Sequence, residues 1–325
     1  MLRMYASRVL YGFALLSLAV PVQAATYTFT TINFGSFNTQ ANGINDSGQI
    51  VGSYFGPGGS VMHGFRYDSG TLTTIDVPGS RTTNDRGINN AGQIVGSYFG
   101  QGGTHGFLDN AGTFLTIDAP NASSTDAYDV NNAGQVVGTY LGPGTEAAAN
   151  RHGFLRSADG ISTIDVPGRA GFTGTMAIND SGQIVGNYSG ADNRNHGYVA
   201  NAGTYTTIDV PGAVGSSANG INNAGLIVGT YTDAQSHSHG FLDDAGNFTT
   251  IDIPGAINSF VNGINAAGQI VGYYTDPAFQ SHAFLATPGN APPPAGAPEP
   301  GSLTILGAGV LALGGLLVIR RGRGI

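Results

Sequence analysis

A pattern of apolar, small and polar positions recurs six times along the chain. In the copy at residues 87–98 (GINNAGQIVGSY), a short, partly apolar stretch precedes Asn-Asn-Ala-Gly and then an alternating Gln-Ile-Val-Gly-Ser-Tyr stretch. Alternation with a period of two predicts a β-strand, and Asn and Gly supply the positive φ angles of a hairpin turn. Each copy therefore predicts two short strands joined by a tight turn.

Two further sequence motifs, called marks below, follow each copy. Every repeat unit is therefore predicted to form four strands, here lettered A to D. The residues that mark strand A are Ile44, Ile88, Val130, Ile178, Ile221 and Ile264, at steps of 42 to 48 residues, and strand B is the Gln-Ile-Val-Gly stretch. Strand C begins with His-Gly or His-Ala and an aromatic residue, at His63, His105, His152, His196, His239 and His282. Strand D carries Thr-Ile-Asp, at Ile75, Ile117, Ile164, Ile208 and Ile251. Repeats of this length indicate a solenoid, a propeller or an array, and four strands make one propeller blade.

The Thr-Ile-Asp mark is displaced in one unit. The sixth unit ends near Leu285 without it, whereas residues 27–33 (YTFTTIN) resemble residues 205–209 (YTTID). An N-terminal strand that completes the last blade closes a ring, which leaves no exposed edge between blades. The sequence therefore predicts an all-β fold, a six-bladed β-propeller of four-stranded blades closed by the N-terminal strand. The alternative is an open β-solenoid, which requires atypical capping repeats at its ends.

The predicted loops differ in variability between the two faces of the ring. The A–B and C–D turns share one face and are short and nearly constant, whereas the B–C and D–A connections share the other face and vary. Variable loops on a constant scaffold commonly carry binding function. The candidate binding residues in and beside them are Phe55, Phe99, Glu146, Arg151, Phe172, Asp192, Arg194, Asp233 and Phe279. The aromatic members, together with Phe260, can stack on sugar rings or fill the funnel between blades.

Composition and charge exclude several classes of function. The chain has no Cys, Lys or Trp, which excludes thiolate nucleophiles, disulfides, Schiff bases and a phosphate-binding loop with its lysine. Residues 25–297 contain seven Arg against nineteen acidic residues, a formal charge of −12. This charge repels phosphate backbones, so nucleic acid is not an expected partner. The 53 Gly suit many tight turns between short strands.

Both ends of the chain carry export features. Residues 1–24 have a basic start, an apolar stretch and small residues before a cleavage site between Ala24 and Ala25, as in a secretory signal peptide. The repeat domain is assigned to 25–287. A Pro/Gly/Ala linker at 288–300 ends in Pro298, Glu299 and Pro300, and the segment 301–325 contains an apolar span at 303–319 before Arg320 and Arg321.

Two family resemblances rest on these motifs. The linked marks of residues 26–287 resemble the HAF-type extracellular repeat family, which implies a surface or secreted location and no particular chemistry. Pro-Glu-Pro, an apolar span and an Arg cluster resemble the PEP-CTERM sorting signal. That resemblance implies a Gram-negative bacterium, transient anchoring in the inner membrane, processing by an exosortase-type enzyme, and delivery to the cell surface or exopolysaccharide matrix. A permanent membrane anchor is the alternative.

The recurrent polar residues predict structural roles. Strand C lies about 9–10 Å outside strand A, so the repeated histidines diverge between blades, and we expect each to bond to backbone between blades and to bind no metal. His237 is expected to be a solvated loop residue. The aspartates Asp76, Asp118, Asp165, Asp209 and Asp252 precede turns, where we expect them to accept hydrogen bonds from turn amides, with calcium binding as the alternative. No cofactor is predicted.

Two functions are compatible with these observations. The first is an exported, non-catalytic surface or matrix protein that binds extracellular polysaccharide through the variable-loop face. The alternative is an extracellular polysaccharide hydrolase or lyase on the propeller scaffold, which needs paired carboxylates that break the six-fold symmetry. The loop acids available for that chemistry are Glu146, Asp192, Asp233 and Asp276.

Overall fold

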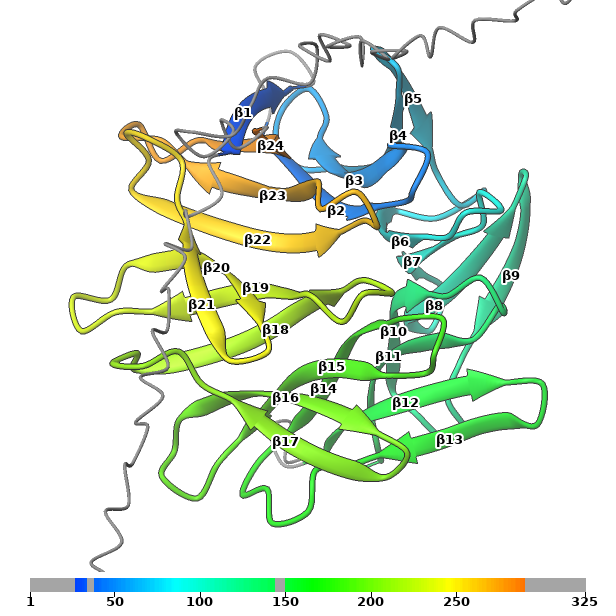
Figure 1. The fold of residues 1–325 in the computed structure, drawn as a ribbon. Coiled ribbons are helices and arrows are strands. Elements are labelled where there is room, and N and C mark those ends of the chain that lie inside the picture. Colours follow the sequence, from blue (N-terminus) through cyan, green and yellow to red (C-terminus); the bar gives the residue numbers. More distant parts are fainter. Residues whose placement is uncertain (1–26, 34–37, 144–149, 290–325) are drawn as a thin grey trace, which may run out of the picture. The chain divides into compact units, whose positions relative to one another are not determined.

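Six four-stranded antiparallel sheets form a β-propeller (Figure 1). The computed structural model describes residues 27–33, 38–143 and 150–289, all of which belong to one compact unit that ends at Gly289. Blades 1 to 5 are β2–β5, β6–β9, β10–β13, β14–β17 and β18–β21, and blade 6 contains β22, β23, β24 and β1. The predicted six-bladed propeller is confirmed, and the solenoid alternative is wrong.

The four predicted strands of each unit occur in the predicted order. Strand A is β2 (Thr39–Ile44), β6 (Thr82–Ile88), β10 (Ser124–Val130), β14 (Thr173–Ile178), β18 (Gly215–Ile221) and β22 (Asn258–Ile264). Strand B is β3 (Ile50–Phe55), β7 (Ile94–Gly100), β11 (Val136–Leu141), β15 (Ile184–Ser189), β19 (Ile227–Thr232) and β23 (Ile270–Thr275). Strand C is β4 (Met62–Asp68), β8 (Gly103–Asn110), β12 (Arg151–Ser157), β16 (Asn195–Asn201), β20 (Ser238–Asp244) and β24 (Ser281–Pro288). Strand D is β5 (Thr71–Ile75), β9 (Thr113–Ile117), β13 (Gly160–Ile164), β17 (Thr204–Ile208), β21 (Asn247–Ile251) and β1 (Tyr27–Ile32).

The strand β1 closes the ring as predicted. It pairs antiparallel with β24 over its full length, from Tyr27 opposite Pro288 to Ile32 opposite Ala283, with Thr31 opposite Phe284. Its Ile32 is 5% exposed and packs into the apolar contact between blades 6 and 1. The first and last described segments therefore share one sheet.

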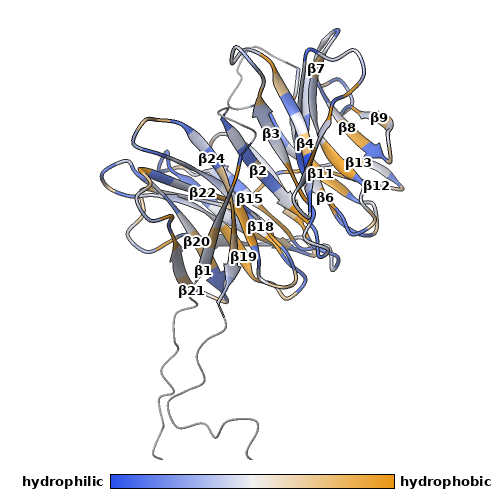
Figure 2. Cartoon of the chain, turned by 90° about the horizontal axis from the view of Figure 1, so that it is seen from above, coloured by the Kyte–Doolittle hydropathy of each residue, from blue (hydrophilic) through white to orange (hydrophobic). Residues whose placement is uncertain are grey.

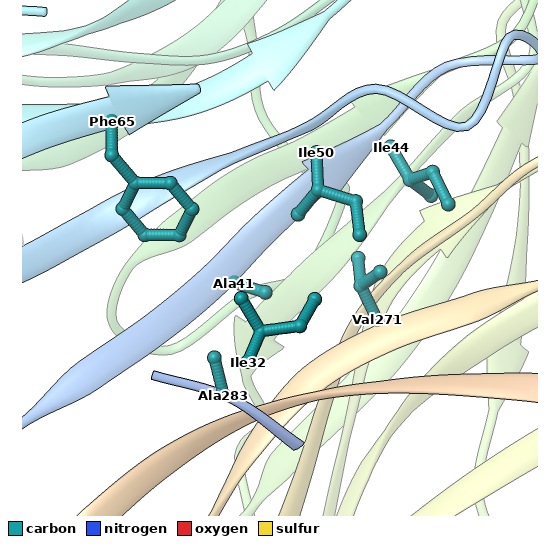
Figure 3. Packing of buried hydrophobic residues seen from close by; sticks show 7 residues of the cluster. All are labelled: Ile32, Ala41, Ile44, Ile50, Phe65, Val271 and Ala283. Carbon is teal, nitrogen blue, oxygen red and sulfur yellow. The ribbon is translucent and has the colours of Figure 1, made fainter. Parts of the chain in front are cut away.

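The core consists of six separate apolar clusters, one between each pair of neighbouring blades. Figure 3 shows the cluster that joins blades 6 and 1, in which side chains from both blades point toward one another. Figure 2, a view from above, places hydrophobic residues along packed strands such as β18 and β19. Because every interface buries apolar side chains, each blade is held by both of its neighbours.

Within each blade, a glycine of strand B faces the aromatic ring of strand C. The aromatic residue of strand C is fully buried in every blade: Phe65, Phe107, Phe154, Tyr198, Phe241 and Phe284. Its ring lies against the glycine of strand B, and a Cβ at Gly52 would be 2.9 Å from the Phe65 ring and 2.0 Å from the carbonyl oxygen of Gln40. The Gln-Ile-Val-Gly mark therefore keeps its glycine because neither the ring nor the neighbouring backbone leaves room for a side chain.

The export features predicted at the two ends of the chain fall outside the described residues. These features are the signal peptide at 1–24 with its cleavage site, and the segment from 290 onward with its Pro-Glu-Pro motif and apolar span. Within the described ranges, no helix has the length and hydropathy needed to cross a membrane.

Candidate functional site

A closed ring of asparagines holds the A–B turns around the central channel. Each side-chain Nδ2 donates to the backbone carbonyl of the next asparagine at 3.1–3.2 Å, in the order Asn45, Asn89, Asn131, Asn179, Asn222, Asn265 and back to Asn45. Within each turn the asparagine Oδ1 accepts backbone N–H groups, for example those of Ser47 and Gln49. The constancy of the Ile-Asn mark therefore has a structural cause, because each copy fastens its blade to the next.

Polar side chains also occupy the next position along the chain in five of the six blades, and blade 6 has Ala266 there. The backbone N–H of Asp46 donates to Asn90, and that of Asn132 donates to Asp180, each at 2.9 Å. Burial opposes ionisation of Asp180, but hydrogen bonds from Asn132 and Asn223 keep the pKa of its carboxyl below the ordinary value. This inner end of the channel, on the A–B turn face, is thus rigid and acidic.

In every blade the innermost strand contains one β-bulge, and its extra residue lines the channel. The register of strand A against strand B shifts at the same place in all six blades. The six bulge residues are Asn42, Arg86, Tyr128, Met176, Asn219 and Asn262, and we call them the collar. A bulge redirects its side chain and is frequent beside functional sites.

The collar lies between two cavities of the channel. The inner cavity, toward the A–B turns, has a volume of about 100 Å³, and the outer cavity, toward the D–A and B–C loops, has about 200 Å³. All six collar residues line both cavities, and Gln40 and Tyr273 complete the lining of the outer one. At a liquid share of about 30 Å³ per water, the outer cavity has room for a small polar ligand.

The two halves of the collar differ in what their side chains do. In blades 1, 5 and 6, Asn42, Asn219 and Asn262 donate Nδ2 to a backbone carbonyl of the following blade at 2.8–2.9 Å. Blades 2, 3 and 4 carry longer side chains at this position. The six-fold repeat is therefore broken inside the channel, in three consecutive blades.

Arg86 is the charged residue of the collar. Its guanidinium carbon lies 4.3 Å from the centre of the Tyr128 ring, a cation–π contact. Among the described residues, the nearest carboxylate oxygen is Oδ1 of Asp126, which lies 3.9 Å from Nη2, too far for a hydrogen bond. The Nε atom is buried, and no hydrogen-bond acceptor among the described residues faces it. The guanidinium therefore presents unused donors to the channel.

The charges of the two cavities differ. Asp46, Asp129 and Asp180 line the inner cavity, where burial raises the pKa of Asp129 to about 6 despite a hydrogen bond from the N–H of Ile178. None of the described residues that line the outer cavity is acidic. Its Tyr273 stacks on Phe260 at 4.5 Å, and burial raises the pKa of that tyrosine.

The loop residues predicted for binding are distributed over all six blades. Phe99 and Phe279 are 40% and 77% exposed, Phe55 and Phe172 are half-buried, and Arg151 and Arg194 are exposed. Phe279 has a positive φ of 59°, a backbone region that is unusual for a bulky residue. Glu146 lies outside the described residues. These residues surround the outer face, whereas the collar lies on its axis.

The repeated histidines bond to a carboxylate of their own blade, so the prediction of backbone partners between blades is wrong. In blades 1 to 5 each Nδ1 lies 2.7–2.9 Å from the aspartate of strand D, in the pairs His63–Asp76, His105–Asp118, His152–Asp165, His196–Asp209 and His239–Asp252. The tyrosine of strand B covers each imidazole, as Tyr54 covers His63 at 5.3 Å. The blade-6 position equivalent to these aspartates is Asn33, and His282 instead uses Nε2 to contact Asp276 at 3.0 Å. These contacts tie strands B, C and D together at the outer face.

The strand-D aspartates also do not receive the turn amides that we predicted. The backbone N–H of Val77, at the start of the D–A turn, donates instead to the hydroxyl of Thr83 in the next blade at 3.0 Å. The same bond recurs between Ala119 and Thr125 and between Val210 and Ser216. A hydroxyl from the following strand A thus accepts the N–H of these turns, and the strand-D aspartates bond to the histidines instead.

Three of the four loop acids considered for catalysis, Asp192, Asp233 and Asp276, support the loops and the histidines, and the fourth, Glu146, lies outside the described residues. Asp192 accepts the N–H of Arg194 and lies 3.0 Å from Nε2 of His196. The other ring nitrogen of His196, Nδ1, contacts Asp209. The bond from Asp192 raises the pKa of His196, and the imidazole in turn lowers the pKa of Asp192.

The Asp233 carboxylate has the same role in blade 5. It accepts the N–H groups of Gln235 and His237 and contacts Nε2 of His239 at 3.2 Å. The imidazole of His237, which we expected to be solvated, is exposed but lies 3.6 Å from Asp233. The loop carboxylates of blades 4 and 5 are therefore already engaged with loop N–H groups and with the histidine of strand C.

Comparison with known proteins identifies the fold. No family model and no curated protein sequence matches the chain. The chain matches TolB from Acinetobacter baumannii at 10% identity with a TM-score of 0.54, over 74% of this chain and 64% of TolB. It also matches a fucose-specific lectin from Aleuria aurantia (10% identity, TM-score 0.48, 81% of this chain and 99% of the lectin). A gluconolactonase from Xanthomonas campestris matches at 14% identity with a TM-score of 0.49, over 81% and 90% of the two chains. The likeness is one of fold.

Proposed function

We propose that this protein is an exported, non-catalytic component of the cell surface or exopolysaccharide matrix that binds extracellular polysaccharide through its outer face. The observation that carries the proposal is the outer cavity, which lies on the axis of the face with variable loops and is lined by the residues at which the repeat is broken. The opposite face, with its rings of Asn and Asp, is nearly constant from blade to blade.

The lining of the outer cavity suits a sugar. Tyr128 and Tyr273 supply aromatic surface and hydroxyl groups, and Gln40 supplies a side-chain amide. Sugar hydroxyl groups require both donors and acceptors, which amides and hydroxyls provide, and the apolar faces of a pyranose ring pack on aromatic rings. The exposed Phe99 and Phe279 add aromatic surface in the surrounding loops.

The export part of the proposal rests on the sequence motifs at both ends. We propose cleavage between Ala24 and Ala25, transient anchoring in the inner membrane through residues 301–325, and processing near Pro298–Pro300 by an exosortase-type enzyme. Mass spectrometry of the protein recovered from the producing cells tests this directly. An intact N-terminus, or an intact C-terminal segment in all recovered protein, would refute the corresponding step.

A glycan array probed with the purified full-length chain tests the binding function. We expect retention of one class of bacterial polysaccharide, weakened when Tyr128→Ala removes the aromatic surface of the cavity. The absence of any bound glycan, with a cooperative thermal transition showing that the protein is folded, would refute the proposal. The same polymers incubated with the protein and analysed for new chain ends test the hydrolase or lyase alternative, and release of products would favour that alternative.

A further inference from the structure

The collar contains a guanidinium whose hydrogen-bond donors have no partner among the described residues. A guanidinium offers five N–H donors in a planar fork, and such groups inside proteins are normally paired with carboxylates or carbonyls. Arg86 makes no hydrogen bond to the described residues, although its side chain is only 25% exposed and its Nε is buried. Its contact with the Tyr128 ring fixes the position of the plane without using a donor.

The surroundings of Arg86 favour an anion on the outer side. The described residues that line the outer cavity include no carboxylate, and Arg86 is the cation among them. The inner cavity contains Asp46, Asp129 and Asp180, which repel an anion. Asp126 lies 3.9 Å from Nη2, close enough to balance the charge but not to occupy the donors.

We propose that the outer cavity binds a carboxylate-bearing sugar, a uronic acid, with the carboxylate on Arg86. This inference rests on the proposed polysaccharide-binding function and names its ligand class. A bidentate carboxylate matches the guanidinium fork, and the Tyr128 ring holds that fork in place. The side-chain amide of Gln40 and the hydroxyl of Tyr273 are available to the sugar hydroxyl groups.

The collar also limits how much of a polymer can enter. Its six side chains lie between the cavities, and the outer cavity of about 200 Å³ holds roughly one sugar ring. A cavity of this size accommodates one unit of a polysaccharide on the channel axis. The site recognises the end of an acidic chain, with the preceding units among the loops of the outer face.

Calorimetric titration of the purified full-length chain, in mild detergent at pH 7, tests the ligand class. The probes are D-glucuronate and its neutral counterpart D-glucose. We expect glucuronate to bind about tenfold more tightly, because hydrogen bonds to charged groups exceed neutral ones by about that factor. Arg86→Asn, which installs the residue found in blades 1, 5 and 6, should remove that advantage.

Two further variants control the titration. Arg156→Asn removes the same charge from β12, away from the collar, and should leave the affinity for glucuronate unchanged. Arg86→Lys keeps the charge without the fork and should give an intermediate affinity. If Arg86→Asn lowers the melting temperature strongly, Arg86→Lys carries the test alone.

The outcomes separate the two proposals. Equal affinity for glucose and glucuronate, unchanged by either Arg86 substitution, would overturn the carboxylate site while leaving polysaccharide binding intact. The carboxylate site would also be overturned if neither sugar binds but the array finds a neutral glycan. No bound glycan of any kind would overturn both proposals.

Discussion

Replacement of Asp85 by alanine should stabilise the protein. The Asp85 carboxyl is completely buried between blades 1 and 2, beside Gly64, and neither oxygen has a hydrogen-bond partner among the described residues. The equivalent position is Ala41 in blade 1 and Ala127 in blade 3. The fold therefore already accommodates alanine at this point of an interface.

The magnitude follows from the buried group. A buried polar group without a hydrogen bond costs about 1–3 kcal/mol. Burial raises the pKa of Asp85 well above its ordinary value, with Asp76 and Asp109 adding repulsion, so keeping the group protonated adds further cost at neutral pH. Removal of the carboxyl leaves a cavity of about one water, about 30 Å³, which costs about 0.7 kcal/mol at 24 cal/mol per Å³. The net gain is about 1–2 kcal/mol or more, which corresponds to an increase in Tm of roughly 2–8 °C.

The gain should depend on pH with a definite sign. Because the folded pKa is raised, the native state binds the Asp85 proton more tightly than the unfolded chain does. The stability of the wild type therefore falls as pH rises from about 3.9 toward the folded pKa, and Asp85→Ala lacks this loss. The stabilisation by the substitution should be smallest near pH 4 and largest above the folded pKa.

Thermal unfolding followed by circular dichroism between pH 4 and 8 measures both effects. Ala127→Asp, the reverse change at the equivalent interface, is the matched control and should destabilise the protein increasingly as pH rises. A lower Tm for Asp85→Ala at pH 7, or a pH profile parallel to that of the wild type, would refute the reasoning.

Three other predictions concern the closing strand, a buried hydroxyl and a loop pair. Deletion of residues 25–34 should lower the Tm severely or cause association. The reason is that β1 contributes ladder hydrogen bonds of about 0.5–1.5 kcal/mol each to a stability of about 5–15 kcal/mol. Truncation after Gly289 should change the Tm little, and equal effects of the two deletions would contradict closure. Tyr198→Phe should raise the Tm by a few degrees, because the buried hydroxyl has no partner among the described residues, and an unchanged or lower Tm would count against this. Asp192→Asn should lower the pKa of His196 in an NMR titration, and an unchanged pKa would contradict the assignment. The raised pKa of His196 contributes stability below about pH 6.5, and this stability is lost as pH rises through the pKa of the folded state. As pH rises from about 6.5, the Tm of Asp192→Asn should therefore fall less than that of the wild type.

The repeat pattern was sufficient to predict the blades and their closure. Apolar alternation specifies strands that are buried on one or both faces, and the displaced Thr-Ile mark at Ile32 specifies which strand completes blade 6. The histidine partners were missed, although a signal existed. In five units the aspartate follows the histidine by 13 residues, as from His63 to Asp76, and the two face each other across the C–D hairpin.

The collar was missed for a different reason. Variation was sought in loops, whereas Arg86, Tyr128 and Met176 lie within strands. A β-bulge leaves the apolar pattern on both sides intact, so binary patterning does not reveal which way its extra residue points. A comparison of the six copies position by position does show that the residue two places before Ile88 is Asn in three copies and Arg, Tyr or Met in the other three.

Pairing of β1 with β24 also determines how the propeller can be tethered. Tyr27 and Pro288 lie opposite each other, and Pro288 approaches Gly268 in an A–B turn, so the chain enters and leaves the propeller side by side on the A–B turn face. The outer cavity opens toward the D–A and B–C loops on the other face. A support that holds either strand end would orient the outer face away from itself, and a fusion partner joined at either end would leave the outer cavity unobstructed.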